Sequence, residues 1–162
     1  MTTDHNKKII ESLYNDAINR KNLPVIDLVI SPDFVSHGIP NAKTGPEGFK
    51  EMIKRFSDAF PDRNITIENM IAEGDVVATR GYWTGTNKGE FMGLPASGKK
   101  VKVEYADFWK ISEGMCIENW VQMDLAGLMV QEGAMSEPID MEEETEEEEV
   151  EVEVEEEEDF LR

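Results

Sequence analysis

The sequence contains one cysteine and two histidines among 162 residues, and it has no long apolar run. A single cysteine cannot form an internal disulfide, so nothing indicates an oxidising compartment. No apolar run approaches the roughly 20 residues that cross a bilayer. The N-terminus also lacks the apolar segment and the cleavage site of a secretion signal. We therefore expect a soluble, cytoplasmic protein that makes no contact with a membrane.

Several common kinds of functional site are missing as well. The sequence has no Gly-rich phosphate loop, no paired cysteines, no His-Glu-x-x-His pattern and no G-x-S-x-G turn. Because His5 and His37 are the only histidines, we expect neither a histidine-rich metal site nor a cofactor. The lysines near residue 100 lie among acidic residues, so a basic surface for nucleic acid is not expected either.

Negative charge is concentrated at the C-terminus. The formal net charge is -19, and residues 136–162 carry 16 acidic residues and one basic residue. Such a block repels itself, so we expect one domain at residues 1–135 followed by a disordered acidic tail at residues 136–162. A cationic partner could bind this tail. The alternating VEVEVE stretch leaves open a second arrangement, in which the tail pairs with a sheet edge that presents Lys or Arg.

The spacing of apolar residues changes near Pro61. Apolar residues recur at helical spacing in residues 5–22 and 45–60, and a short helix is expected to start at Pro24. Between these helices, residues 31–38 predict a turn and a brief extended piece. Alternation then predicts four strands, at residues 63–72, 76–86, 99–111 and 115–123. Helices followed by an antiparallel meander indicate an α+β fold, whose curved sheet can enclose a hollow for a small molecule.

The last predicted strand ends in the stretch ENWVQMD, where Trp120, Gln122 and Asp124 share one face. An aromatic residue, an amide and an acid on one face are typical of a pocket wall. A carboxylate in an apolar cavity has a raised pKa, which suits it to proton exchange near neutral pH. The alternative is that Asp124 caps the helix expected in LAGLMVQ, and for the stretch taken alone this simpler explanation is the stronger one.

Other polar and aromatic residues are candidates for the same hollow. His37 follows the apolar DFV and titrates near neutral pH, so it is the second catalytic candidate, although a structural histidine is at least as common. Aromatic residues in strands pack in the core more often than they bind ligands, and Tyr14 contributes a hydroxyl only if it faces inward. The candidate substrate contacts are Tyr14, Trp83, Tyr105, Trp120 and Gln122.

Six motifs, in order and with plausible spacing, resemble the SnoaL-like polyketide cyclases and the wider group of ester cyclases. They are PDFVSHG, GPEGF, AFPD, AEGDVVATRGYWTGTNKGEFMGLPASGKKV, DFWKI and IENWVQMDLAGLMVQEG. The resemblance covers about residues 5–133. It implies the cone-shaped α+β barrel that ketosteroid isomerases and scytalone dehydratases share, usually dimeric through the open face of the sheet.

The resemblance also implies roles for individual residues. In the family, the Asp that closes a W-x-x-x-D strand is the acid/base of a metal-free aldol cyclisation, and Asp124 occupies that position. It would take a proton from a carbon between a ketone and an ester, and return one to the new alcohol oxygen. His37 matches a frequent His after DF and would line the pocket. PASGK replaces the common PPTGK, a loop change that affects pocket entry.

Three functional hypotheses follow. The first is a cofactor-independent homodimeric enzyme, a cyclase, isomerase or hydrolase, which uses Asp124 on a small hydrophobic substrate. The second is a binding domain that holds a small molecule without turnover. The third is a dimeric interaction protein that displays the acidic tail to a cationic partner. The fold alone does not decide function, so other features must separate these hypotheses. An acid in the cavity favours the first hypothesis, and the acidic tail favours the third.

Overall fold

The protein is described by a computed structural model that covers residues 2–136. Residues 137–162, almost all of the expected acidic tail, lie outside the described part, so the disorder and the partner expected for them stay predictions. Within residues 2–136, no helix is both long and apolar enough to cross a membrane.

The first helix changes its winding halfway along. Helix α1 (Thr3–Ser12) is capped by Thr2, whose side chain accepts a hydrogen bond of 3.2 Å from the backbone N–H of His5. Asp4 lies inside the first turn. The chain then continues directly as a π-helix, η1 (Leu13–Asn19), in which backbone hydrogen bonds span five residues. Helical spacing predicted the whole segment but not the wider turn.

The next three elements are a short helix, a strand and a longer helix. Helix α2 (Pro24–Val29) begins at a proline, as predicted. Strand β1 (Ile30–His37) follows without a break, and helix α3 (Gly45–Ala59) ends just before Pro61. The sequence predicted only a turn and a brief extended piece where β1 forms.

Four further strands form an antiparallel meander, and their positions agree with the prediction to within one residue at each end. They are β2 (Asn64–Glu73), β3 (Val76–Thr86), β4 (Lys100–Ser112) and β5 (Met115–Met123). The sheet order is β1-β5-β4-β3-β2, with β1 added parallel to β5 at one edge. A short helix, α4 (Leu125–Gln131), follows β5. The order of elements confirms the α+β class.

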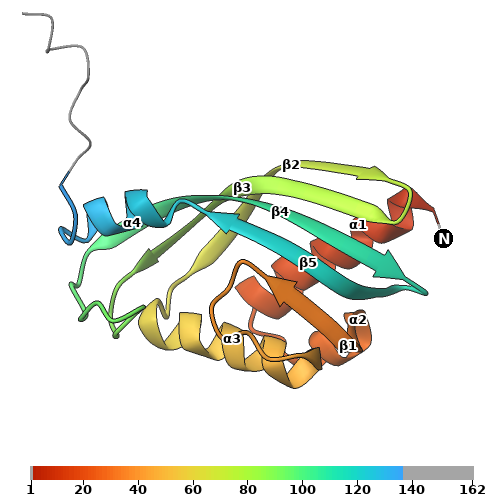
Figure 1. The fold of residues 1–162 in the computed structure, drawn as a ribbon, viewed down its shortest axis with the longest axis horizontal. Coiled ribbons are helices and arrows are strands. Elements are labelled where there is room, and N and C mark those ends of the chain that lie inside the picture. Colours follow the sequence, from red (N-terminus) through yellow and green to blue (C-terminus); the bar gives the residue numbers. More distant parts are fainter. Residues whose placement is uncertain (1, 137–162) are drawn as a thin grey trace, which may run out of the picture.

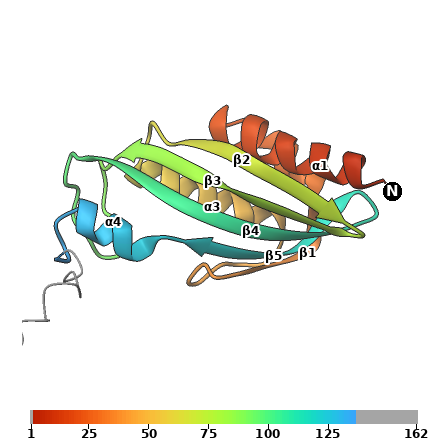
Figure 2. The ribbon, with the colours of Figure 1, turned by 90° about the horizontal axis from the view of Figure 1, so that it is seen from above.

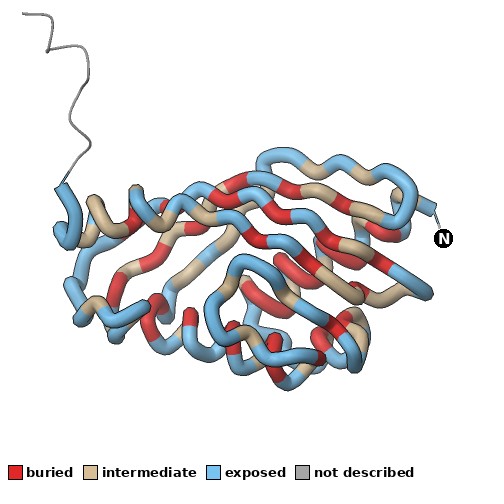
Figure 3. Tube along the Cα trace, in the orientation of Figure 1, coloured by how far each residue is buried: buried red, intermediate tan, exposed pale blue. Residues whose placement is uncertain are grey.

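The curved sheet covers the N-terminal helices. Figure 1 shows the sheet arched over α1 and α3, and Figure 2 shows from above that the sheet crosses α3 while α1 lies along its β2 edge. Buried and exposed positions alternate along the strands in Figure 3, so one face of the sheet packs on the helices and the other faces outward. The core therefore lies between this inner face and the helical layer.

A bulge in β2 adds to the curvature of the sheet. The register between β2 and β3 shifts between Ile67 and Asn69, next to Gly81. A Cβ atom at Gly81 would lie 1.9 Å from the carbonyl oxygen of Thr66, so only glycine permits this close approach. Because bulges bend a strand and increase its twist, this point helps the sheet to curve around its helices.

Candidate active site

An apolar cavity lies between the inner face of the sheet and helices η1 and α3. Its inner part has a volume of about 60 Å³ and is lined mostly by apolar and aromatic side chains. It shares Ile39, Met52, Phe56 and Met123 with an outer part of about 450 Å³. The two parts together fall within the range of small-molecule sites, roughly 300–1,000 Å³.

A second hollow is larger but chemically unsuitable. It has a volume of about 560 Å³ and runs along the outer surface of α1 and η1. Charged and amide side chains line it, including Lys8, Glu11 and Asn15, and it is open to solvent. Because binding sites for small organic molecules are mainly apolar and enclosed, we place the candidate active site in the cavity under the sheet.

A buried carboxylate lies in the wall of this cavity. Alternation along β4 turns Tyr105, Asp107 and Trp109 inward, and Asp107 is only 5% exposed. The hydroxyl of Tyr14, from η1, donates a hydrogen bond to Asp107 Oδ2. Trp109 Nε1 donates in turn to the Tyr14 oxygen at 3.1 Å. This chain of hydrogen bonds fixes the orientation of the carboxylate.

Burial changes the acidity of both ionisable groups in the chain of hydrogen bonds. Loss of hydration raises the pKa of Asp107 from 3.8 to about 7, although the Tyr14 hydroxyl and the backbone amide of Gln122 lower it. Burial, followed by the charge of Asp107, raises the pKa of Tyr14 well above its ordinary value. The phenol therefore remains a donor at neutral pH, while Asp107 is present in both its protonated and ionised forms.

Four polar atoms around the cavity are buried and have no hydrogen-bond partner at normal distance and angle within the described chain. They are Asp107 Oδ1, Asn119 Oδ1, the Tyr105 hydroxyl and Trp83 Nε1. Burial raises the pKa of Tyr105 to about 12, so its hydroxyl keeps its proton. Buried polar groups are nearly always hydrogen-bonded, and this concentration of unpaired groups provides donors and acceptors for a polar ligand.

The π-helix η1 forms one wall of the site. Tyr14 and Ile18 lie in η1 and line the cavity. The Asn19 side chain at its end donates to the Ile65 carbonyl at 2.9 Å and accepts from the Ile65 N–H at 2.8 Å. These two bonds fasten the end of η1 to β2. Segments of π-helix occur frequently at functional sites, in agreement with the position of Tyr14.

The predicted position of Asp124 is wrong. Its side chain is exposed and accepts a hydrogen bond of 2.8 Å from the Gly127 N–H, at the N-terminus of α4. The opposite face of β5, with Asn119, Val121 and Met123, lines the cavity. The helix-capping alternative is therefore confirmed, and Asp124 does not reach the apolar cavity on which its catalytic role depended.

His37 also lies outside the cavity. Its side chain is 45% exposed, with Nε2 2.7 Å from Glu118 Oε1, and its ring stacks on Trp120. The parallel pairing of β1 with β5 sets His37 beside Trp120, on the outer face of the sheet. The predicted cavity positions of His37, Trp120 and Gln122 are therefore wrong, because these residues lie on the outer face.

Of the predicted substrate contacts, Tyr14, Trp83 and Tyr105 do line the cavity and remain candidates. The residue that sequence reasoning missed is Asp107. The predicted strand at residues 99–111 already placed Asp107 between Tyr105 and Trp109 on one face, so an acid in an otherwise apolar row was the available signal. Within residues 2–136, no group of three or more His, Cys, Asp or Glu side chains is arranged to hold a metal ion.

Comparison with solved structures extends these observations. TsrD from Streptomyces laurentii is 27% identical, with a TM-score of 0.77 over 83% of this chain and 99% of TsrD. IdmH from Streptomyces antibioticus, assigned as a polyketide cyclase, is 28% identical, with a TM-score of 0.68 over 79% of this chain and 98% of IdmH. AclR from Streptomyces galilaeus, assigned as a hydroxylase, is 26% identical, with a TM-score of 0.74 over 85% and 86% of the two chains.

A search of curated proteins gave no match. The sequence matches the family described as SnoaL-like polyketide cyclase over residues 8–132, from the middle of α1 to the end of α4. This range includes every element that lines the cavity, together with Tyr14 and Asp107. Sequence and fold therefore agree, and the chain belongs to the SnoaL-like polyketide cyclase family.

Proposed function

We propose that the protein is a cofactor-independent enzyme of the cyclase or isomerase type, and that Asp107 rather than Asp124 is its acid/base. One observation carries this proposal: Asp107 is a buried carboxylate in an apolar cavity, with a pKa of about 7 and one oxygen unpaired within the described chain. A group that gains and loses a proton near neutral pH is suited to general acid/base catalysis.

In the first step, ionised Asp107 takes a proton from a substrate carbon next to a carbonyl group. The C–H bond breaks, its electron pair becomes part of the enolate, and the proton goes to Oδ1. The hydrogen bond from Tyr14 to Oδ2 keeps the carboxylate oriented with Oδ1 available. Tyr105 and Trp83 have unpaired donor groups in the same cavity, which can hydrogen-bond the enolate oxygen.

In the second step, the proton on Asp107 returns to the substrate. In a cyclisation, the enolate carbon forms a C–C bond with a second carbonyl of the same molecule, and the resulting alkoxide oxygen takes the proton from Oδ1. In an isomerisation of a β,γ-unsaturated ketone, the proton taken from the α-carbon returns to the γ-carbon of the conjugated dienolate, and the double bond moves next to the carbonyl. Both routes leave Asp107 ionised, so the same residue serves as base and then as acid.

Deuterium exchange tests the first step without knowledge of the natural substrate. A bicyclic ketone such as 2-tetralone is incubated with the protein in D2O, and loss of its α-proton signals is followed by NMR. We expect the protein to accelerate exchange, with a rate that rises with pH and has its midpoint near 7, because only the ionised Asp107 is a base. Asp107→Asn should slow exchange by about 100-fold or more.

Asp124→Asn provides the matched control, because it also converts an aspartate to an amide but lies at the surface. We expect this variant to exchange the ketone at the wild-type rate. Unchanged exchange in Asp107→Asn would contradict the proposal, and so would a wild-type protein that never exceeds the buffer rate. Loss of exchange in Asp124→Asn alone would restore the original assignment.

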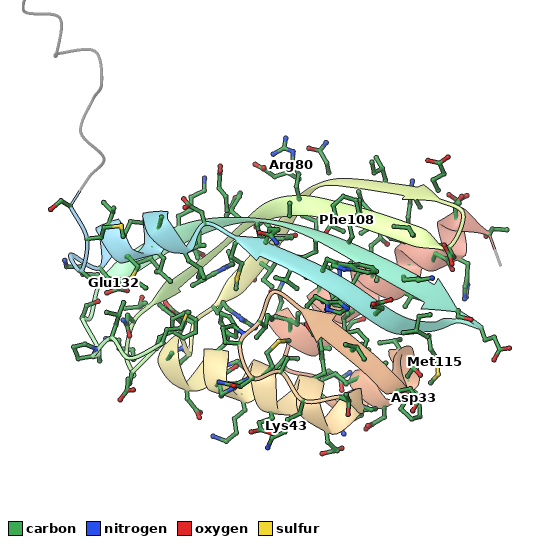
Figure 4. All side chains as sticks on the ribbon, viewed as in Figure 1. Asp33, Lys43, Arg80, Phe108, Met115 and Glu132 are labelled. Carbon is green, nitrogen blue, oxygen red and sulfur yellow. The ribbon has the colours of Figure 1, made fainter. Side chains whose placement is uncertain are left out.

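We also infer that the protein forms a homodimer through the outer face of the sheet, as the family resemblance implies. Strand register aligns Ile71, Ala78, Phe108, Trp120 and His37 in one row across this face, called the outer row below. Figure 4 labels Phe108 on this face. Ile71 is 70% exposed and Phe108 is 52% exposed. A mostly apolar row on an outward-facing sheet surface is typical of an interaction surface.

Light scattering tests the dimer. The chain has a mass of 18.4 kDa, and we expect twice this mass at micromolar concentration. Phe108→Glu should yield a monomer, because it places a charge in the centre of the outer row. Lys43→Gln, on the helical side in Figure 4, should remain a dimer. A wild-type monomer at micromolar concentration contradicts this inference.

A further inference from the structure

Arg63 is a cationic residue in the wall of an otherwise largely apolar inner cavity. It lies between α3 and β2, and its guanidinium carbon is 4.4 Å from the centre of the Phe56 ring. As a whole residue Arg63 is only partly buried. Loss of hydration nevertheless lowers the pKa of the guanidinium to about 10, with Tyr14 acting in the opposite direction. Arg63 and Tyr14 thus lie at the same cavity.

Within residues 2–136, the Arg63 side chain has neither an ion pair nor a hydrogen bond. Its guanidinium group makes a cation–π contact with the Phe56 ring. Two other arginines are paired, whereas Arg55, at the outer part of the cavity, has no ion pair within residues 2–136 either. Arg20 pairs with Asp16 at 2.8 Å, and Arg80 pairs with Glu68 at 3.0 Å, both at the surface. A guanidinium group carries five N–H donors in a fixed planar arrangement, which can bind a carboxylate through two parallel hydrogen bonds. In Arg63 these donors have no acceptor within residues 2–136.

Poorly hydrated charges destabilise a folded protein unless they are paired. Phe56 offsets part of this cost through its ring face, but it accepts no conventional hydrogen bond from the guanidinium. Asp107, the acid of the same cavity, already accepts a hydrogen bond from Tyr14 and is not among the groups that shift the pKa of Arg63. An anion that enters the cavity is therefore the partner that the chemistry of Arg63 fits.

We propose that Arg63 binds a carboxylate of the substrate, so that the enzyme acts on a carbonyl compound that is also an acid. This inference rests on the proposed function only in taking the cavity as the substrate site. The carboxylate would lie at Arg63 while the reacting carbonyl lies near Asp107, with Tyr14 between the two ends. Such two-point binding holds the acidic carbon of the substrate in one orientation toward Asp107 Oδ1.

A pair of matched probes tests the inference by binding alone. 2-Naphthoate and 2-naphthamide have nearly the same size and shape, but only the first carries a carboxylate. Their affinities for the full chain are measured by calorimetry at pH 8, with tryptophan fluorescence as a second readout. We expect naphthoate to bind about 10- to 100-fold more tightly, as expected for charge-assisted hydrogen bonds to one guanidinium group.

Arg63→Gln should remove this preference and leave the affinity for naphthamide unchanged. Arg63→Lys, which keeps the charge but not the planar donors, should retain only part of it. Arg80→Gln makes the same substitution on the surface and should behave as wild type. Thermal melting of each variant establishes that it is folded, and the lysine variant carries the test if the glutamine variant fails to fold.

Three results would overturn the inference: equal affinity for the two probes, binding of neither probe, or a preference for naphthoate that survives in Arg63→Gln. The test is separate from that of Asp107. If Arg63 binds naphthoate but the protein exchanges no ketone protons, the acid/base proposal fails and the anion site stands. If exchange depends on Asp107 but the naphthoate preference is absent, only the Arg63 inference fails.

Discussion

The raised pKa of Asp107 predicts that this residue destabilises the fold at neutral and alkaline pH. Its pKa is 3.8 when freely hydrated and about 7 in the folded protein. Between these values the folded state holds a proton that the unfolded state has lost, so raising the pH favours unfolding. A difference of about three pKa units corresponds to about 4 kcal/mol, lost progressively from about pH 4 to just above pH 7.

Asp107→Asn removes the ionisation but keeps a side chain of the same shape, whose oxygen can still accept the Tyr14 hydrogen bond. We expect this variant to match the wild type near pH 4 and to be more stable by up to about 4 kcal/mol at pH 8. Urea unfolding at half-unit steps between pH 4 and pH 9 measures the difference. Other ionisable groups largely cancel, because they are common to both proteins.

Asp62→Asn provides a control of opposite sign. The backbone N–H and the hydroxyl of Thr86 hydrogen-bond Asp62 and lower its pKa. Wild-type Asp62 therefore stabilises the fold above its unfolded pKa and loses this effect as the pH falls, so Asp62→Asn should be less stable than wild type at pH 8. A constant difference between wild type and Asp107→Asn across the pH range would refute the assignment of a raised pKa to Asp107.

Three further outcomes are expected. Tyr14→Phe removes the hydrogen bond that lowers the pKa of Asp107, so the carboxyl signal of Asp107 in an NMR titration should move to a higher midpoint than in wild type, and an unchanged midpoint would contradict the geometry. Asp124→Ala should lower stability by about 1 kcal/mol through loss of the α4 cap, while Asp124→Asn should not; equal losses in urea unfolding would argue against capping. Removing residues 137–162 should leave the thermal midpoint nearly unchanged, because this charged segment offers little apolar area to bury; a large fall would indicate a structural strand.

Patterns with a strong period predicted most of the fold. The change from helical to alternating spacing at Pro61 located α3 and the four strands of the meander, and the alternation is most regular in β3 and β4. Strand β1 was predicted only as a turn and a brief extended piece, because its partner, β5, is about 85 residues away and the pairing is parallel. Nothing local to residues 30–37 specifies that partner, so only the assembled sheet turns the segment into a strand.

The site was predicted less well, for a related reason. Two faces of β5 were distinguished correctly, but the choice of which face points inward was wrong, and with it the positions of Trp120 and Gln122. Alternation defines two faces of a strand without saying which one is buried when both carry aromatic or apolar residues. In β4 the buried face is clear from the sequence, because five apolar residues share the face of Asp107. The regular alternation of β4 therefore indicates a buried acid more reliably than the alternation of β5 does.

The π-helix η1 makes the site depend on chain length as well as on residue type. Each residue of an α-helix turns by about 100°. Deleting one residue between Tyr14 and Asn19 would therefore rotate Tyr14, with Ile9 and Ile10 of α1, away from the surfaces they now contact. Insertion or deletion of one residue in this helix would thus move Tyr14 into or out of the cavity, an effect that no single substitution reproduces. Among relatives, the length of the first helix should divide chains that keep a tyrosine beside the buried acid from those that have lost it.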